Sequence, residues 1–381
     1  MNTYLVGGAV RDALMGLPVQ DRDWVVVGGT PQELLDQGYL PVGRDFPVFL
    51  HPASHEEYAL ARTERKTAPG YRGFEIHAAP DVTLEEDLAR RDLTINAMAV
   101  PADRVHDQGI DPATVVDPFG GQRDLKLGVL RHVTPAFRED PVRILRVARF
   151  CARFVHFHIA PETLQLMQEM VHAGEVDHLV PERVWQEWAR GLMEARPSRM
   201  IEALQHCGAL ARLLPALTWD ALNVQALDQA ATQGAVLEVR FACLLGRLGP
   251  QAGSALRAPS DCTALAELLG REHAHFDAAL HMQPPALAQL LDRCDAWRKP
   301  ARFELLLQAY ALVAPLAAAS QSARTCARVR KAWAAAQAIA TKEIAAHAIQ
   351  TGANGIKVGE AIHTARVNAI GTALESVNSP H

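Results

Sequence analysis

The chain has 381 residues, of which 49% are hydrophobic and 21% are charged, and its formal net charge is −5. This composition is typical of a globular protein with two or three domains and an ample core. The negative net charge excludes a uniformly basic nucleic-acid coat, so a polyanion would have to meet a local cluster of arginines.

The N-terminal region begins with alternating strand and helix signals. An apolar strand over 4–6 ends at the glycine pair Gly7-Gly8, after which a helix is expected. Asp21 and Asp23 then lead into a second apolar strand, over 24–27. Because the side chains of a strand alternate between its faces, residues two apart point the same way and lie about 7 Å apart. The two carboxylates therefore form a candidate site for a divalent cation.

Further signals complete this region. Capping boxes that begin at Thr30 and Thr83 each predict the start of a helix. A strand is expected over 57–63, and the polar segment over 65–80 is predicted to be a mobile loop. The residue types of the segment 117–121, Asp-Pro-Phe-Gly-Gly, predict a turn.

Helical periodicity dominates the chain after about residue 138. This change predicts an α/β head on an all-helical body. The expected helices are about 141–155, 161–173, 181–194 and 198–210, followed by an alanine-rich helix over 312–348 and a last segment after Gly359.

Cysteines and apolar stretches indicate the compartment. The six cysteines are widely spaced without a C-x-x-C motif, which is typical of buried thiols in a reducing compartment. No uninterrupted apolar stretch reaches about 18 residues, and Arg11 and Asp12 interrupt the N-terminal segment before a signal sequence could form. We therefore expect a cytoplasmic protein that does not bind a membrane.

Arginines near the glycine pair and near residue 90 indicate a phosphate ligand. Arg11 lies close to a helix N-terminus, where a cation is unfavourable unless an anion is bound nearby. Backbone N–H groups at a glycine turn suit the phosphates of a nucleoside triphosphate. In the triplet Arg90-Arg91-Asp92, Arg91 is expected to reach phosphate or ribose, and Asp92 to hold the geometry by a charge-assisted hydrogen bond. The alternative for this triplet is a surface ion pair of little energetic value.

The helix expected after Asp140 carries the strongest arginine pattern. Asp140 has a structural alternative as the N-cap ahead of Pro141. An ordinary solvated helix face would intersperse acidic residues among cations, so this stripe is expected to face a polyanion. At 100° per residue, four arginines fall within about 120° of one another: Arg143, Arg146, Arg149 and Arg153.

Together these motifs resemble those of the bacterial class II tRNA nucleotidyltransferases, the CCA-adding enzymes. The resemblance is strong over about residues 1–215, and it is especially close to the enterobacterial branch over 4–65 and 129–154. The shared motifs, in order, are Gly-Gly-Ala-Val-Arg-Asp (7–12), Asp-Arg-Asp-Trp (21–24), Arg-Arg-Asp-Leu-Thr-Ile-Asn-Ala (90–97), Asp-Pro-Phe-Gly-Gly (117–121) and Glu-Asp-Pro-x-Arg-x-x-Arg (139–146).

The resemblance implies an α+β fold with a polymerase-β-like nucleotidyltransferase head, in which helices accompany a mixed sheet, over 1–138. A helical neck with the nucleotide-selecting helix would cover 139–215, and a helical body and tail for tRNA binding 216–381. The implied activity is template-independent addition of C, C and A to the 3′ end of tRNA from CTP and ATP, with release of pyrophosphate by two-metal phosphoryl transfer.

The same resemblance assigns roles to residues of this chain. Asp21 and Asp23 would be catalytic and hold Mg²⁺, and Glu64 is a candidate third carboxylate. The segment 65–80 would match the family's mobile segment, which is linked to the switch from C to A addition. The implied nucleotide-binding residues are Gly8 and Arg11 for the triphosphate, Arg91 and Asp92 for the ribose, Asp140 and Arg143 as an imitation of a templating base, and Arg146 and Arg149 as support for that site.

The sequence departs from the enterobacterial relatives where their phosphohydrolase domain carries a His-Asp doublet. Gly246-Arg247 stands there instead, so the sequence predicts a single activity, with a degenerate or missing phosphohydrolase site. Four residues nearby have partial helical spacing for a metal, although helix-face histidines without a metal are commoner. These residues are His273, His275, Asp277 and His281.

Three alternatives stay open. A bacterial poly(A) polymerase would share the head and use only ATP. A partial enzyme would add only CC or only A, and the motifs do not exclude it. An RNA chaperone would need no catalysis, and the carboxylate pair of Asp21 and Asp23 argues against it. The sequence does not indicate an oligomeric state.

Overall fold

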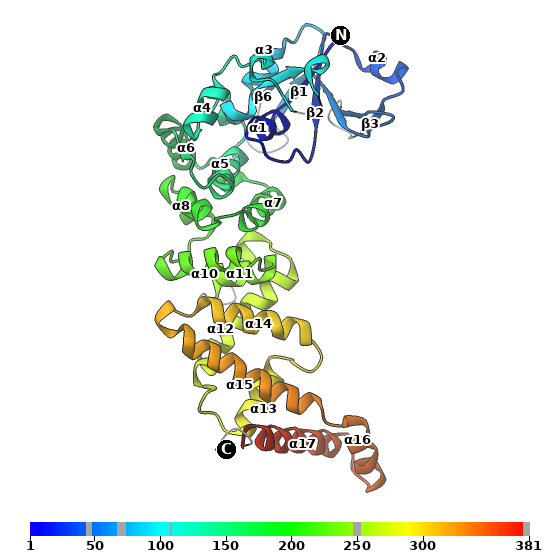
Figure 1. Cartoon of the computed structure of the whole chain (residues 1–381), viewed down its shortest axis with the longest axis vertical. Coiled ribbons are helices and arrows are strands. Elements are labelled where there is room, and N and C mark those ends of the chain that lie inside the picture. The colour runs from blue at the N-terminus through cyan, green and yellow to red at the C-terminus, as the bar shows by residue number, and fades with distance from the viewer. Residues whose placement is uncertain (43–47, 67–73, 107–108, 247–252, 376–381) are drawn as a thin grey trace. The chain divides into compact units, whose positions relative to one another are not determined.

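The computed structural model describes residues 1–42, 48–66, 74–106, 109–246 and 253–375 (Figure 1). The chain divides into two compact units, Met1–Pro215 and Ala216–His381. The boundary expected near residue 138 lies inside the first unit, and the division of this unit into head and neck stays a prediction.

A six-stranded mixed sheet forms the centre of the N-terminal region. Its strand order is β3-β4-β5-β2-β1-β8. Strands β2 and β5 run parallel, whereas the other neighbours run antiparallel. The strands are β1 (Asn2–Val6), β2 (Asp23–Val27), β3 (Leu40–Val42), β4 (Val48–Leu50), β5 (Glu57–Leu60) and β8 (Ala99–Pro101).

Helices cover both faces of this sheet because its strands place apolar side chains alternately on either side. The helices of this region are α1 (Gly8–Leu14), α2 (Pro31–Asp36), α3 (Leu84–Ala89) and α4 (Gly121–Leu127). Leu5 and Trp24 pack with α1 on one face, and Val6 and Val25 pack with α3 on the other. The predicted capping boxes of α2 and α3 are both present.

The segment predicted as a loop over 65–80 is partly a β-ladder. Strands β6 (Thr63–Lys66) and β7 (Phe74–His77) pair antiparallel, and residues 67–73 lie outside the described part. The strand expected over 57–63 is also split, because β5 ends at Leu60. The polar composition of this segment predicted a loop, but hydrogen bonds between strands join backbone groups and form with polar side chains as well.

The predicted turn at 117–121 is confirmed, and it fixes the start of α4. The carboxylate of Asp117 accepts hydrogen bonds from the backbone N–H groups of Gly121 (2.6 Å) and Gln122 (2.9 Å). A Cβ atom on Gly121 would lie 2.3 Å from the carbonyl oxygen of Thr94, so only glycine fits. This turn therefore packs directly against the 3₁₀ segment Thr94–Asn96.

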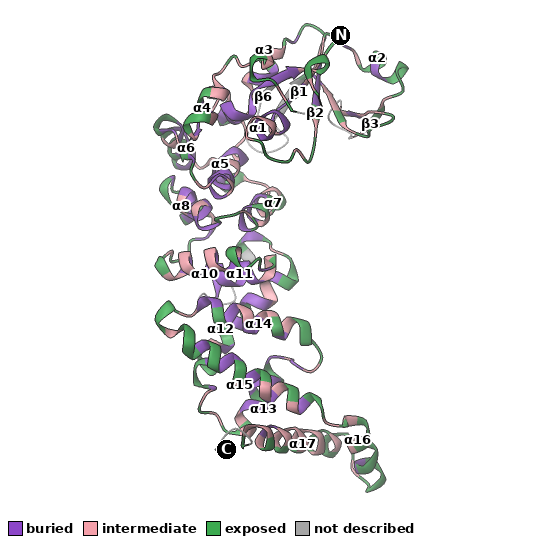
Figure 2. Cartoon of the chain, in the orientation of Figure 1, coloured by how far each residue is buried: buried purple, intermediate pink, exposed green. Residues whose placement is uncertain are grey.

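The rest of the first unit is mainly helical. Helix α5 packs against α7 and α8 and is buried along most of its length (Figure 2). A short parallel pair of strands, β9 (Val129–Leu130) and β10 (His158–Ile159), departs from the all-helical pattern expected for this region. Four helices lie close to their predicted ranges: α5 (Val142–Arg153), α6 (Pro161–His172), α7 (Pro181–Leu192) and α8 (Ser198–His206). The short helix α9 (Ala209–Leu213) follows α8 and had no predicted range of its own.

The second unit is built from helices over its described residues. The single helix expected over 312–348 is wrong, because α14 ends at Val313 and Pro315 starts a 3₁₀ turn. Proline disfavours a helical conformation in the residue before it, and Ala314 is extended. The helices are α10 (Ala221–Thr232), α11 (Leu237–Leu245), α12 (Ser260–Ala278), α13 (Pro284–Arg293), α14 (Pro300–Val313), α15 (Ala319–Gln337), α16 (Thr341–Gln350) and α17 (Gly355–Glu375).

All six cysteines are free and buried, which confirms the prediction of buried thiols. Burial raises the pKa of the Cys243 thiol to about 12.

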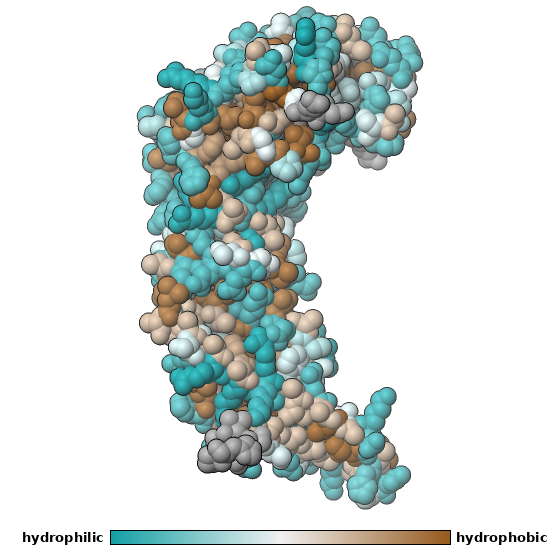
Figure 3. All heavy atoms as spheres, viewed as in Figure 1, coloured by the Kyte–Doolittle hydropathy of each residue, from teal (hydrophilic) through white to brown (hydrophobic). Residues whose placement is uncertain are grey.

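No single described helix is long and apolar enough to cross a membrane. The pair Pro300–Val313 and Leu316–Gln337 is long and apolar enough when its two parts are taken together, but the pair is bent by 119°. On the face drawn in Figure 3, hydrophobic residues form patches among hydrophilic ones.

Candidate active site

The strand register brings predicted and unpredicted site residues into one row. Val6 of β1 lies opposite Asp23 of β2, and Asp23 lies opposite Glu57 of β5. Paired residues on neighbouring strands share a face, so the carboxylates of Asp23 and Glu57 point to the same side of the sheet. The chain leaves β1 at Gly7, which places the glycine turn beside these carboxylates.

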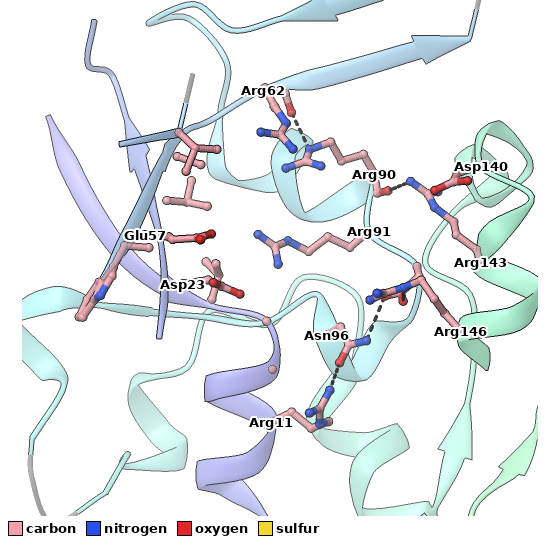
Figure 4. A pocket seen from close by; sticks show the side chains of 18 of the residues that line it. Arg11, Asp23, Glu57, Arg62, Arg90, Arg91, Asn96, Asp140, Arg143 and Arg146 are labelled. Atoms are coloured by element: carbon pink, nitrogen blue, oxygen red, sulfur yellow. Dashed lines mark hydrogen bonds and ion pairs between the residues drawn. The ribbon is translucent and has the colours of Figure 1, made fainter. Parts of the chain in front are cut away.

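A pocket of about 550 Å³ opens over this row. Figure 4 shows the side chain of Arg91 pointing toward Asp23 and Glu57. Arginines outnumber acids in the lining, which suits a polyanionic ligand. The charged lining residues are Arg11, Arg62, Arg90, Arg91, Arg143, Arg146, Arg183, Asp23, Glu57, Asp92 and Asp140, and Gly7 and Gly8 also line the pocket.

The predicted carboxylate pair lies at the start of β2 rather than inside it. The strand begins at Asp23, and Asp21 is exposed ahead of it and lines a second pocket that shares Asp23 with the first. Reduced hydration in the pocket raises the pKa of Asp23; Arg91 opposes this shift, and Asp21 adds to it. The two carboxylates therefore repel each other, and a divalent cation would relieve that repulsion.

This donor set fits Mg²⁺, which prefers carboxylate oxygens completed by water and substrate phosphates. Among the described residues, no three His, Cys, Asp or Glu side chains lie close enough together to hold a metal ion. The side chain of Glu64, the predicted third carboxylate, lies outside the described part. Glu57 instead stands next to Asp23, and sequence analysis missed it because strand pairing was needed to find it.

The glycine turn and Arg11 form the end of the pocket suited to phosphates. Gly7 has a φ of +71°, and a Cβ atom there would lie 2.8 Å from Nη1 of Arg91. Arg11 is buried and donates from Nη1 to Oδ1 of Asn96 (2.5 Å) and from Nε to Oδ1 of Asp12 (2.8 Å). Burial lowers the pKa of Arg11. The unfavourable position of Arg11 near a helix N-terminus was the reason to expect a bound anion. Asp12 and Asn96 already compensate for that position within the protein.

The motif at residues 90–92 is held by a carboxylate that sequence analysis missed. The fully buried Asp87 accepts hydrogen bonds from Nη2 of Arg90 (2.7 Å) and Nη2 of Arg91 (3.1 Å). Burial alone would raise the pKa of Asp87, but the two guanidinium groups hold it below its usual value. Asp87 rather than Asp92 holds the guanidinium of Arg91, which follows the last turn of α3 four residues after Asp87.

Asp92 joins the sheet region to α5, and its expected role at the ribose stays a prediction. It accepts hydrogen bonds from Nδ2 of Asn96 (3.0 Å) and from Nε of Arg146 (2.7 Å). Burial opposes ionisation, yet these two partners hold the pKa of Asp92 well below its usual range. The same ion pair raises the pKa of Arg146.

Acidic side chains pair with arginines of the α5 stripe. Nε of Arg149 donates to Glu187 (2.6 Å) and Nη2 of Arg153 to Asp12 (2.8 Å), and a polyanion facing the stripe stays a prediction. These acids come from segments distant in sequence, which a local pattern cannot show. Arg143 and Arg146 line the pocket, whereas Arg149 lies outside its lining and packs 4.8 Å from the centre of the Phe150 ring.

Asp140 and Arg143 lie together at the other end of the pocket (Figure 4). Arg143 donates to the carbonyl oxygens of Ala136 (2.7 Å) and Arg90 (2.5 Å). The carboxylate of Asp140 accepts from the N–H of Val142 (3.1 Å), but Pro141 rather than Asp140 has the N-cap position of α5.

Arg183 of α7 is a pocket residue that sequence analysis missed. It donates to both carboxylate oxygens of Asp140, at 3.1 Å and 2.7 Å. Such a two-pronged contact fixes the plane of the Asp140 carboxylate. Its signal in the sequence was an arginine in the first turn of a helix, the same unfavourable placement that singled out Arg11.

The histidines of α12 make local contacts. Nδ1 of His273 lies 3.3 Å from Oδ2 of Asp277, whose other oxygen accepts from the hydroxyl of Tyr310 (2.8 Å). Nδ1 of His275 lies 3.3 Å from the buried Glu272. Gly246 ends α11, and Arg247 lies outside the described residues. These contacts account for the His273 and His275 positions without a metal.

A carboxylate on a mixed sheet, beside a glycine turn and under an arginine-rich pocket, is the arrangement of a polymerase-β-like nucleotidyltransferase head. A family model described as "Poly A polymerase head domain" matches residues 3–131. A second, described as "Probable RNA and SrmB- binding site of polymerase A", matches residues 156–220. The first match falls within the first unit, and the second begins there and extends past its end at Pro215.

Full-length relatives identify the family. The chain is 52% identical over 424 aligned positions to the "Multifunctional CCA protein" of Polaromonas naphthalenivorans, covering 100% of both chains. It is also 52% identical to the protein of that name in Acidovorax ebreus, over 421 positions that cover 100% of this chain and 98% of the relative. The chain therefore belongs to the family of multifunctional CCA proteins, the CCA-adding tRNA nucleotidyltransferases, which confirms the predicted family.

Solved structures of CCA-adding enzymes share the fold. An apo form matches with a TM-score of 0.72 and 21% identity, covering 99% of this chain and 91% of that one. Complexes with ATP and with CTP each match with a TM-score of 0.70, at 21% and 19% identity and over 89% and 88% of their chains. The Thermotoga maritima enzyme complexed with tRNA matches with a TM-score of 0.66, at 21% identity and over 92% of its chain. The predicted fold class, a polymerase-β-like head followed by helices, is confirmed.

Proposed function

We propose that this chain adds C, C and A to the 3′ end of tRNA, from CTP and ATP and without a nucleic-acid template. The observation that carries the proposal is one pocket with Asp23 at its wall, Arg11 and Arg91 at one end, and Asp140 with Arg143 at the other. Neighbours in fold bind ATP, CTP and tRNA, as their titles state. The 52% identical relatives support the same activity.

The triphosphate would lie at the end of the pocket formed by the glycine turn. Gly7 and Gly8 leave room for phosphate oxygens close to the backbone, where N–H groups can donate to them. Arg11 and Arg91 would contribute charge-assisted hydrogen bonds from fixed positions, because Asp12, Asn96 and Asp87 hold their guanidinium groups.

The base would lie at the end formed by Asp140 and Arg143. A carboxylate accepts and a guanidinium donates hydrogen bonds, and cytosine and adenine each offer both kinds of partner on their edges. Arg183 orients Asp140, and Asp92 positions Arg146 next to this pair. Nucleotide choice would therefore come from fixed protein groups in place of a template strand.

The reaction is an in-line displacement at the α-phosphorus. The 3′ oxygen of tRNA forms the new bond, the bond to the bridging oxygen breaks, and pyrophosphate leaves. Mg²⁺ held by Asp21 and Asp23 would lower the pKa of the attacking hydroxyl and offset charge on the phosphates. The arginines of the pocket would stabilise the charge that develops on the leaving pyrophosphate.

Incubation with tRNA that lacks its CCA end tests this function. With CTP and ATP together, we expect three nucleotides to be added in the order C, C, A. Growth of a long tail with ATP alone would instead identify a poly(A) polymerase, which the 52% identical relatives disfavour. Products that stop after CC, or that form only on tRNA already ending in CC, would identify a partial enzyme.

The remaining expectations belong to this proposal. The second unit would bind the tRNA body through shape and backbone contacts, as proteins commonly recognise folded RNA. Nucleotide addition would be the single activity of the chain, in the cytoplasm. Arg149 would support the site indirectly, through Glu187 on the helix that carries Arg183.

A further inference from the structure

A second pocket, of about 850 Å³, lies within the first unit beside the nucleotide pocket. Its walls are the loop between α1 and β2 over residues 15–21, the segment 153–157 after α5, and Glu194 with Ala195. Its volume lies within the usual range for sites that hold small ligands. The function proposed above leaves this pocket unassigned.

The two pockets meet at the carboxylate pair. Both are lined by Gly8, Arg11 and Asp23, whereas Asp21 lines only the second. In an in-line displacement the attacking and leaving oxygens lie on opposite sides of the phosphorus. If pyrophosphate leaves toward Arg91 in the first pocket, the attacking hydroxyl has to arrive from the side of Asp21.

The walls of the second pocket suit a nucleotide more than a free phosphate. Leu17 is exposed on one wall, and Phe154 and Phe157 lie on the other. Between them, Arg153 packs 5.2 Å from the centre of the Phe154 ring and keeps about a third of its side chain exposed. The exposed ring of His156 also lines the pocket. Apolar and aromatic surfaces bind base faces, and a guanidinium binds a phosphate.

Hydrogen bonds from Arg199 hold the segment 153–157 in place. Arg199 donates to the carbonyl oxygens of Phe154 (3.4 Å) and Phe157 (2.8 Å), and also to that of Val155. The ion pair between Arg153 and Asp12 of α1 (2.8 Å) also holds this segment. Arg153 and His156 are therefore presented on a pre-ordered wall, which reduces the entropy lost on binding.

We propose that the second pocket binds the last nucleotide of the tRNA acceptor end. Its 3′ hydroxyl would face Asp21 and Asp23, its phosphate would contact Arg153, and its base would stack on His156. This inference rests on the proposed function, and it assigns a role to Arg153, which the nucleotide pocket does not use. Arg153 and His156 would bind the substrate away from the reacting phosphorus.

Steady-state kinetics on the full chain tests the assignment. Arg153→Gln should raise the KM for tRNA lacking its CCA end on the order of tenfold, the effect of losing one charge-assisted contact. The KM for CTP should stay within about twofold. Arg104→Gln is the matched control, because Arg104 is also paired with a neighbouring aspartate, Asp103 (3.7 Å), but lines neither pocket. Equal changes in both KM values, or none in either, would overturn the role of Arg153.

A second pair of variants avoids the ion pair with Asp12 and keeps the test valid if Arg153→Gln fails to fold. His156→Ala should raise the KM for tRNA, and His156→Phe, which keeps a ring, should restore it. If both variants behave as the native chain does, His156 does not stack on the acceptor end, and that part of the assignment fails.

Crosslinking locates the acceptor end directly. A tRNA that ends in 4-thiouridine, irradiated with the full chain, should label residues in 15–21 or 153–157, as mapped by mass spectrometry of peptides. Normal CCA addition with labelling only elsewhere would overturn this inference and leave the proposed function standing. Absence of any nucleotide addition to tRNA would overturn the proposed function itself.

Discussion

Asp23 and Glu57 lie opposite each other on the parallel strands β2 and β5, and both line the pocket assigned to the nucleotide. This pairing joins residues from different parts of the sequence into one acidic edge. The loop between α1 and β2 places Asp21 just outside it. Variants of these carboxylates can show which of them the reaction requires.

The double variant Asp21→Ala, Asp23→Ala should abolish nucleotide addition. Both carboxylates that would hold Mg²⁺ are lost, so we expect kcat to fall by at least about a thousandfold. Incorporation of radiolabelled CTP into tRNA is the measurement. Isothermal titration with Mn²⁺ in the presence of CTP provides a second readout, and turnover that survives in this variant would refute the metal assignment.

Glu57→Gln should weaken metal use more than nucleotide binding. Glu57 stands beside Asp23 without taking part in the predicted pair, and removal of a supporting carboxylate typically costs about 10- to 100-fold in metal affinity. We expect the Mg²⁺ concentration for half-maximal activity to rise, with little change in the KM for CTP. Glu85→Gln, at an exposed position on α3, is the control. An unchanged Mg²⁺ requirement would leave Glu57 without a role in the site.

Arg143→Ala should blur the choice among nucleotides more than it slows phosphoryl transfer. The guanidinium of Arg143 would donate to the base edge, and one good base contact discriminates by about 1–3 kcal/mol. The ratio of kcat/KM for CTP to that for UTP should therefore fall by about 5- to 150-fold. Arg138→Ala, whose side chain is exposed and paired with Glu169, is the control. Equal losses for both nucleotides would contradict this role.

Asp92→Asn should destabilise the first unit in a pH-dependent way. Removing one partner of a buried ion pair costs about 3–5 kcal/mol, reduced here because Arg146 is partly exposed. Because the folded pKa of Asp92 is lowered, its stabilisation is present above the unfolded pKa of about 4 and is lost as the pH falls toward the folded value. Urea unfolding at pH 7 and pH 3 should show a smaller difference between variant and native chain at pH 3. A constant difference would show that ionisation of Asp92 is not the cause.

The second unit should have no metal-dependent phosphatase activity. Gly246 stands where the enterobacterial relatives would carry the first residue of a His-Asp doublet. Release of phosphate from p-nitrophenyl phosphate with Mn²⁺, Co²⁺ or Ni²⁺ should match that of the Asp21→Ala, Asp23→Ala variant. Activity that disappears in His273→Ala would instead show that α12 holds a metal site.

Local signals predicted the elements of this fold well. The capping boxes at Thr30 and Thr83 and the glycine turn at Gly120-Gly121 set helix starts through contacts within a few residues. The failures were of two kinds. Pairing of β6 with β7 depends on a partner strand that polar composition does not reveal. The helix expected over 312–348 breaks at Pro315, because a proline ends a helix even within a segment of high alanine content.

The site was predictable where chemistry follows from adjacent residues. Asp23, Arg11, Arg91, Asp140, Arg143 and Arg146 all reach the nucleotide pocket. Two other pocket residues could not be predicted from the nearby sequence. Glu57 reaches the pocket through strand pairing, and Arg183 reaches it through helix packing. The ion pairs of the α5 stripe were not predictable for the same reason, because their acids lie on other elements: Asp12, Asp92 and Glu187.

Arg11 borders both pockets, and its guanidinium is immobilised by Asp12 and Asn96. Asp12 also pairs with Arg153, so one carboxylate holds both an arginine that borders the two pockets and an arginine that lines only the second. Thermodynamic linkage is reciprocal. If bound CTP raises the affinity for the RNA terminus by some factor, the bound RNA terminus raises the affinity for CTP by the same factor. Such cooperative binding would favour the ternary complex of the protein with CTP and tRNA, and would disfavour hydrolysis of CTP in the absence of tRNA.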